Sequence, residues 1–192
     1  MPTILTHAAV PLALGLGLGS RLLPPRLVFA GVLAAMLPDL DVIAFRLHIP
    51  YADNFGHRGI SHSLVFALAV GWLALFAAPQ LRSPRWLAFS FISLATASHG
   101  LLDMFTNGGL GVALWWPWSA ERLFAPWPVI EVSPLTLQRL LSPRGLAVLL
   151  SELHWVWLPA LGFSCVLLLG RKIGKLITQL TGTNGNGYYP DR

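Results

Sequence analysis

Long apolar runs separated by short polar segments dominate the hydropathy pattern of this chain. Five runs can be delimited: Ile4 to Gly19, Leu27 to Phe45, Ser63 to Pro79, Trp86 to Phe105 and Gly145 to Gly170. A membrane-spanning helix needs about 20 predominantly apolar residues, so most of these runs have the length of a span and the first is near the lower limit. The pattern predicts an all-α fold, an integral membrane bundle of about four to five transmembrane helices.

Composition and charge support a membrane protein. Of the 192 residues, 55% are hydrophobic and only 11% are charged, whereas an average soluble domain carries about 25% charged residues. The formal net charge is +5, but the basic residues are scattered among apolar runs, so we expect no nucleic-acid partner. The single cysteine, Cys165, excludes an intramolecular disulfide. We predict one membrane-embedded domain over residues 1–175 and a flexible, Gly/Asn-rich tail over 176–192.

A tryptophan-rich stretch follows the fourth apolar run. Trp115, Trp116, Trp118 and Trp127 lie within it. Indole rings favour the boundary between hydrocarbon and head groups, so this stretch is predicted to be an interfacial segment. The expected partner is the lipid bilayer, and the oligomeric state is left open.

Basic residues also predict the orientation of the chain in the membrane. Arg21 and Arg26, then Arg82 and Arg85, and finally the cations from Arg171 onward flank alternate ends of the runs, so they share one face. By the positive-inside rule this face, with the C-terminus, is cytoplasmic. The histidines and aspartates that could bind a ligand then share the extracytoplasmic face.

These polar residues have the spacing of metal ligands. His99 and Asp103 are four positions apart and project from one helix face, and ionisable groups inside apolar spans usually mark function. Pro38 interrupts the second run just before two aspartates. The candidate metal ligands are His7, Asp39, His57, His62, His99 and Asp103. This nitrogen and oxygen donor set suits one or two divalent transition metal ions, zinc first and manganese or iron as alternatives.

Two further residues are assigned catalytic roles. Two-metal sites that activate water are typical of phosphoester hydrolysis. Asp41 is predicted to be a bridging ligand or general base, with a helix-capping role for Asp39 or Asp41 left open. Arg58, in the segment HRGISHS, is predicted to clamp a phosphate oxygen in the transition state.

Four segments in this order carry a family resemblance: THAAVPLALGLG, LPDLD, HRGISHS and SHGLLDMFTNGG. Over roughly residues 1 to 130 the chain resembles the YdjM-type family of membrane-bound, metal-dependent hydrolases, also described as LexA-binding inner-membrane-associated hydrolases. The resemblance implies a multi-pass protein of the bacterial inner membrane. More distantly, the order of His and Asp residues is similar to zinc-dependent phospholipase C, which implies that the metal ligands are His7, Asp39, His57 or His62, His99 and Asp103. Those enzymes carry a further HxxxE pair, whereas Glu152 and His154 have the wrong order and spacing here.

The resulting hypothesis is a membrane-bound metal-dependent hydrolase that cleaves a phosphoester of a lipid, or of another interfacial substrate, by metal-activated water. One alternative is a transporter or a proton- or metal-binding protein that uses the same cluster. The other is a membrane scaffold for a cytosolic partner. A transporter would place its polar residues along a path to both faces, and a scaffold would need a sizeable cytoplasmic surface.

Overall fold

The computed structural model describes residues 1–134 and 136–181, and in this part the chain is helical with no strand. Twelve helical segments follow one another in these described residues, with α marking α-helices, η1 to η3 marking 3₁₀ turns and η4 a π-helical turn. Their bounds are η1 Ile4–Ala8, α1 Ala9–Leu18, α2 Pro25–Met36, η2 Leu37–Val42, α3 Ile43–Arg46, η3 Ile60–His62, α4 Leu64–Ala77, α5 Arg85–Met104, α6 Leu137–Leu140, α7 Pro143–Glu152, η4 Leu153–Trp157 and α8 Leu158–Leu180.

Proline and serine residues mark several helix boundaries. Pro25 is the first residue of α2, where its fixed φ favours a helix and its missing N–H costs nothing. Ser63 caps α4, because its side chain accepts a hydrogen bond from the backbone N–H of Phe66. The chain changes from α2 to the 3₁₀ turn η2 at Leu37, next to Pro38, as the proline in the second run predicts.

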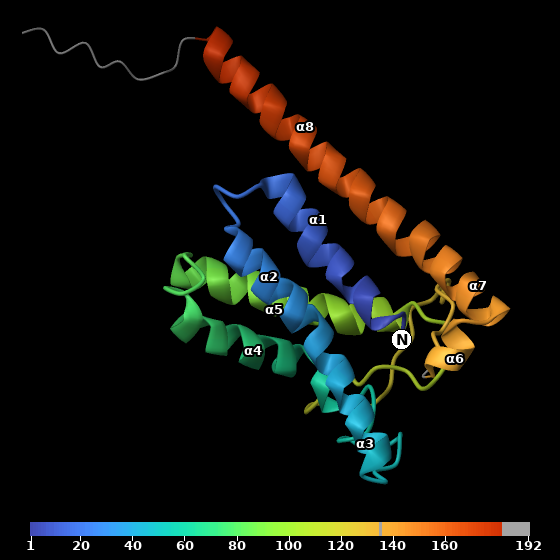
Figure 1. Ribbon diagram of the computed structural model, residues 1–192. Coiled ribbons are helices and arrows are strands. Elements are labelled where there is room, and N and C mark those ends of the chain that lie inside the picture. Colours follow the sequence, from blue (N-terminus) through green and yellow to red (C-terminus); the bar gives the residue numbers. More distant parts are fainter. Residues whose placement is uncertain (135, 182–192) are drawn as a thin grey trace, which may run out of the picture.

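Helix α5 lies at the centre of the bundle and packs against both α2 and α4, while α1 packs against α8 (Figure 1). A buried apolar cluster joins the first three of these helices and includes Leu27, Ala34, Ala74, Phe91 and Ile92. The turns that join α1 to α2 and α4 to α5 lie at one end of the bundle, and the N-terminus and α3 lie toward the other (Figure 1).

Three helical stretches are long and apolar enough to cross a membrane: Pro25–Arg46, Arg85–Met104 and Pro143–Leu180. Two shorter apolar helices, Ile4–Leu18 and Leu64–Ala77, accompany them. The prediction of an all-α membrane bundle is therefore confirmed. The last helix differs from the fifth run, because it continues beyond Gly170 to Leu180 through residues most of which, such as lysine, arginine and leucine, favour a helix. Residues 176–180 of the predicted tail are thus helical, and 182–192 lie outside the described residues.

The segment between α5 and α6 is largely irregular over its described residues. It is held by two isolated bridges, Thr106 with Ile130 and Val112 with Leu123. Trp115, Trp118 and Trp127 are at least half exposed on it. These exposed indole rings fit the interfacial position that the sequence predicts.

Candidate metal centre

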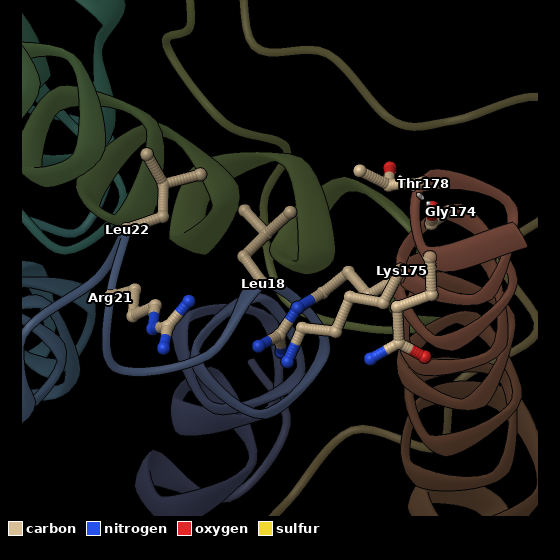
Figure 2. Close-up of a pocket in the computed structure, with 8 residues that line it drawn as sticks. Leu18, Arg21, Leu22, Gly174, Lys175 and Thr178 are labelled. Atoms are coloured by element: carbon tan, nitrogen blue, oxygen red, sulfur yellow. Dashed lines mark hydrogen bonds between the residues drawn. The ribbon is translucent and has the colours of Figure 1, made fainter. Parts of the chain in front are cut away.

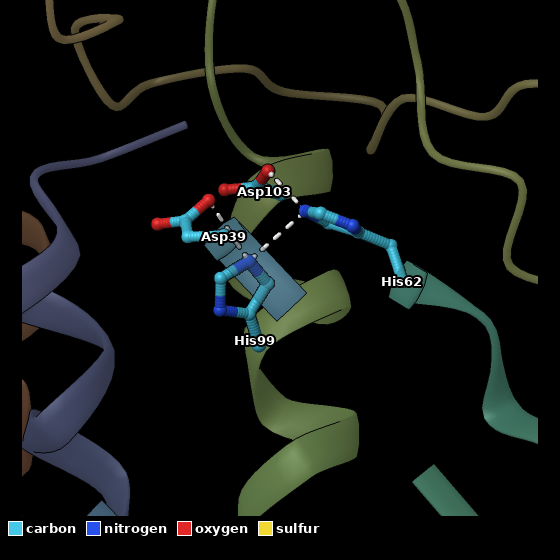
Figure 3. A group of neighbouring side chains, drawn as sticks. All are labelled: Asp39, His62, His99 and Asp103. Atoms are coloured by element: carbon cyan, nitrogen blue, oxygen red, sulfur yellow. Dashed lines mark hydrogen bonds and ion pairs between the residues drawn. The ribbon is translucent and has the colours of Figure 1, made fainter. Parts of the chain in front are cut away.

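Four separate elements bring five predicted ligands together in the protein interior. His7 lies on η1, Asp39 on η2 and His62 on η3, while His99 and Asp103 lie one turn apart on α5. All five side chains are buried. Figure 3 shows Asp39, His62, His99 and Asp103 pointing toward a common centre. We call these five residues the metal centre.

The distances within the metal centre are those of groups that face one another. Nε2 of His7 lies 3.7 Å from Oδ2 of Asp39 and 3.6 Å from Oδ1 of Asp103. Nε2 of His99 lies 3.4 Å from Oδ1 of Asp39 and 3.0 Å from Nε2 of His62. Nε2 of His62 lies 3.4 Å from Oδ2 of Asp103. The four residues other than His7 each offer a ligand atom within 4.8 Å of the others.

Several of these atoms lack the hydrogen bonds that buried polar groups normally make. Among the described residues, both carboxylate oxygens of Asp39 and both ring nitrogens of His7 are buried without a hydrogen-bond partner. The Asp103 carboxylate also accepts no hydrogen bond, but it has the Arg58 guanidinium as an ion-pair partner. A buried carboxylate that is left unsatisfied costs several kcal/mol unless a cation balances it. The donor set therefore fits a divalent cation.

A backbone hydrogen bond selects the tautomer of His99 that can bind a metal ion. Nδ1 of His99 lies 2.7 Å from the carbonyl oxygen of Ala35 in the last turn of α2. Because a carbonyl oxygen can only accept, Nδ1 carries the proton and donates it. In the neutral ring Nε2 then carries the lone pair, and this atom faces the metal centre.

Asp41 and His57 form a second group beside the metal centre. The Oδ1 atom of Asp41 lies 2.5 Å from Nδ1 of His57, and its Oδ2 atom lies 3.2 Å from Nδ1 of His62 and accepts a hydrogen bond from Ser61 Oγ. Asp41, His57 and His62 together could also hold an ion. The structure thus assigns His57 to the second group and leaves His62 shared by both.

Burial by itself lowers the pKa of the His62 imidazole, but the facing carboxylates of Asp103 and Asp41 favour the protonated ring. Their effect is larger, and the pKa of His62 is raised to about 9. A positive charge is therefore favoured at this position between the two carboxylates.

Arg58, the predicted phosphate clamp, is fully buried with a positive φ of 61°. Its Nε lies 2.9 Å from Oδ2 of Asp103. Nη1 donates to the carbonyl oxygens of Gly108 and Leu110, and Nη2 donates to Oγ1 of Thr106. A guanidinium has five N–H groups; protein oxygens accept hydrogen bonds from three of them, and Nε is held by the ion pair with Asp103. In this structure Arg58 joins Asp103 to the segment after α5.

A glycine allows two ligand-bearing elements to approach closely. A Cβ atom at Gly100 would lie only 2.5 Å from the carbonyl oxygen of His62. The backbone of η3 can therefore pack directly against α5 beside His99, which brings His62 within reach of the metal centre.

Glu152 has a role that the spacing of HxxxE motifs does not reveal. Its carboxylate is buried and accepts hydrogen bonds from the backbone N–H and hydroxyl of Thr3 and from the hydroxyl of Thr6. It thereby ties the end of α7 to the turn that carries His7. An acidic residue inside an apolar run is the sequence signal that could have indicated such a role.

Comparison with known proteins is consistent with a membrane location. The family described as YdjM inner membrane protein matches residues 1–175. Inner membrane protein YbcI of Escherichia coli (strain K12) is 52% identical over 162 residues, which cover 84% of this chain and 94% of YbcI. Inner membrane protein YdjM of the same strain is 39% identical over 103 residues, or 47% of this chain and 49% of YdjM. No solved structure matches the chain. Because the family match spans nearly the whole chain, the protein belongs to the YdjM inner membrane protein family.

Proposed function

We propose that this protein is a membrane-embedded, metal-dependent hydrolase that cleaves a phosphoester of a lipid. The observation that carries the proposal is the pair of buried carboxylates, Asp39 and Asp103, which face three histidines without a hydrogen bond among the described residues. Arg58 balances the charge of Asp103 but not that of Asp39, so the pair favours a further cation, at a point where four elements of the chain converge.

Asp39, His62, His99 and Asp103 would hold the ion, with His7 beside them. Mixed imidazole and carboxylate donors suit zinc, and they suit manganese or iron as alternatives. A bound ion of this kind polarises a phosphoryl oxygen and lowers the pKa of water.

The neighbouring residues orient the ligands. Ala35 holds the His99 ring through its carbonyl oxygen, and Asp41 holds the His62 ring at Nδ1. Such partners fix the tautomer and the direction of a ligating imidazole. Asp41 accepts bonds from several neighbours, so we propose that it orients His62 and His57, in place of the bridging role. Arg58 holds Asp103, in place of clamping a phosphate.

A groove of about 490 Å³ beside Asp39 supports access for a lipid. Its lining residues are Met1, Thr3, Ile4, Asp39, Val42, Phe45, Arg46, Ser133, Pro134, Thr136 and Leu140. The walls are mainly apolar and suit an acyl or isoprenoid chain. Arg46 is exposed, and its side chain forms no hydrogen bond or ion pair within the described part of the chain. We propose that it attracts the phosphate of the substrate.

The proposed orientation places the metal centre on the extracytoplasmic side of the inner membrane and the C-terminus in the cytoplasm. The support is the charge asymmetry of the short turns: Arg21, Arg26, Arg82 and Arg85 flank the turns between α1 and α2 and between α4 and α5. Short loops rich in arginine and lysine remain on the cytoplasmic side.

Elemental analysis of the detergent-purified protein tests the proposal. The wild type should contain one or two equivalents of zinc, manganese or iron, and a His99→Ala/Asp103→Ala variant should contain almost none. His154→Ala/Glu121→Ala is the matched control, because both residues are exposed and lie outside the metal centre. It should keep its metal and its hydrolysis of phospholipid or isoprenoid phosphate substrates.

Two results would contradict the proposal. Wild-type protein that stays metal-free after reconstitution would rule out the metal centre. Metal-loaded protein that hydrolyses none of these lipid phosphates would instead support the alternative of a membrane metal-binding protein.

A further inference from the structure

A second groove lies at the other end of α1, away from the metal centre. It is about 620 Å³ in volume and is formed by the end of α1, the turn that follows it and the last turns of α8. The lining residues are Leu18, Arg21, Leu22, Arg171, Gly174, Lys175, Thr178 and Gln179. We call it the basic groove. Figure 2 shows Arg21 and Lys175 reaching toward each other across it from the turn and from α8.

The position of Arg171 in the basic groove is fixed by the end of α1. Its Nη1 donates a hydrogen bond of 3.0 Å to the carbonyl oxygen of Gly17. Gly19 has a positive φ of 75°, and a Cβ atom there would collide with the Arg171 guanidinium. The chain thus leaves room for this cation against the α1 terminus, where the helix dipole favours positive charge.

Positive charge in the basic groove has no counterion among the residues that the structure describes. Three of its lining residues, Arg21, Arg171 and Lys175, are cations and none is acidic. Within residues 1–134 and 136–181 these three side chains form no ion pair. Cations that converge in this way repel one another unless an anion lies between them.

The surroundings of the basic groove are apolar. Leu18 and Leu22 belong to its walls, and the apolar residues Ile173, Leu176 and Ile177 are exposed on the adjoining turns of α8. The groove also lies where the apolar part of α8 gives way to basic residues, which is the position of a membrane interface. A ligand that fits it carries both an anionic head and apolar chains.

We propose that the basic groove binds the phosphate head group of an anionic phospholipid. Arg21 and Lys175 would contact the phosphate beside the fixed Arg171, and Gln179 offers a further hydrogen-bond donor. Basic pockets between membrane helices are suited to such head groups, and each nearby cation contributes to their attraction. This site is separate from the metal centre and does not depend on hydrolase activity.

Native mass spectrometry of the full chain in detergent tests this proposal with phosphatidylglycerol as the probe. An Arg21→Gln/Lys175→Gln variant should raise the apparent dissociation constant of the one-to-one complex at least about tenfold. The matched control is Arg85→Gln/Lys172→Gln, which removes the same charges from exposed residues that do not line the groove. It should change the dissociation constant less than about twofold.

A further variant and two further ligands distinguish a lipid site from attraction by bulk charge and from a site for a soluble phosphate. An Arg21→Lys/Lys175→Arg variant keeps both charges and should bind like the wild type, and phosphatidylcholine should bind far more weakly than phosphatidylglycerol. Equal losses in the groove variant and the control would overturn the proposal, because bulk charge would then account for binding. Full displacement of the lipid by equimolar glycerol phosphate would overturn it as well, since the ligand would then be a soluble phosphate.

Discussion

Oδ2 of Asp41 lies 3.2 Å from Nδ1 of His62, while Nε2 of the same ring faces the metal centre. A neutral imidazole has one N–H and one lone pair, so a carboxylate at Nδ1 keeps the proton there and frees Nε2 for a cation. This pairing links the two groups of the site and explains how Asp41 can affect metal binding without being a ligand.

Replacing Asp41 with Asn should therefore weaken metal binding without removing the site. We expect the affinity for zinc to fall about 10- to 100-fold at an unchanged number of bound ions, because the carboxylate that orients His62 is lost. Competition titrations against a zinc chelator measure both quantities. Asp53→Asn, an exposed carboxylate outside both groups, is the control. A fall in the number of ions would show that Asp41 is itself a ligand.

Protonation of His62 predicts the pH dependence of the ion-free protein. The pKa of His62 is about 9, above the ordinary value of 6.5. Protonation of His62 therefore stabilises the folded protein fully below pH 6.5, and this stabilisation is lost as the pH rises toward 9. A cation must displace this proton, so the apparent affinity for zinc should rise about tenfold per pH unit over the same window. Thermal unfolding of ion-free protein and zinc titration measure the two trends. An affinity independent of pH would contradict the assignment of His62 as a ligand.

Substitution of Gly100 by Ala should disrupt the metal centre from a position that carries no ligand. The added methyl would lie 2.5 Å from the carbonyl oxygen of His62 and would push η3 away from α5. We expect a loss of stability of about 1–3 kcal/mol and reduced metal content. Gly162→Ala is the control, because nothing lies within 4 Å of its added Cβ. In unfolding curves that control should be as stable as the wild type or slightly more stable, and in elemental analysis its metal content should be unchanged.

Loss of Arg58 should affect stability as well as activity. An Arg58→Gln variant removes the ion-pair partner of the buried Asp103 carboxylate and the donor to two carbonyl oxygens. Removing one partner of a buried ion pair costs about 3–5 kcal/mol. The thermal midpoint should therefore drop sharply even in ion-free protein. A stable variant with normal metal content and lost turnover would instead support the role of Arg58 as a phosphate clamp.

Arg46 should affect substrate affinity alone. Its exposed side chain lines the groove beside Asp39, so Arg46→Gln should raise KM for a lipid phosphate about tenfold and leave kcat and stability nearly unchanged. Arg139→Gln is the control, because Arg139 is exposed and does not line this groove. Equal effects of the two substitutions, in steady-state kinetics on mixed micelles, would mean that surface charge alone attracts the substrate.

Much of the fold follows from the sequence because hydropathy is a property of consecutive residues. The apolar runs predict the helices near their observed positions, and Pro38 predicts the change of helix type before Asp39. The parity of the spans already groups His7, Asp39, His99 and Asp103 at one end. The end of α8 was less predictable, because nothing between Gly170 and Leu180 breaks a helix although the composition turns polar.

The roles within the site depend on side-chain direction, which local sequence does not encode. His57 and His62 stand in the same short loop and look equivalent, yet only His62 reaches the metal centre, because Gly100 lets its backbone touch α5. Arg58 resembles a surface clamp in sequence, but the segment after α5 folds over it and accepts its hydrogen bonds. Hydropathy and residue identity are therefore enough to predict the membrane helices and the kinds of side chain in the site. Which of those side chains share the centre is a property of the folded chain, since it depends on packing between segments that are far apart in sequence.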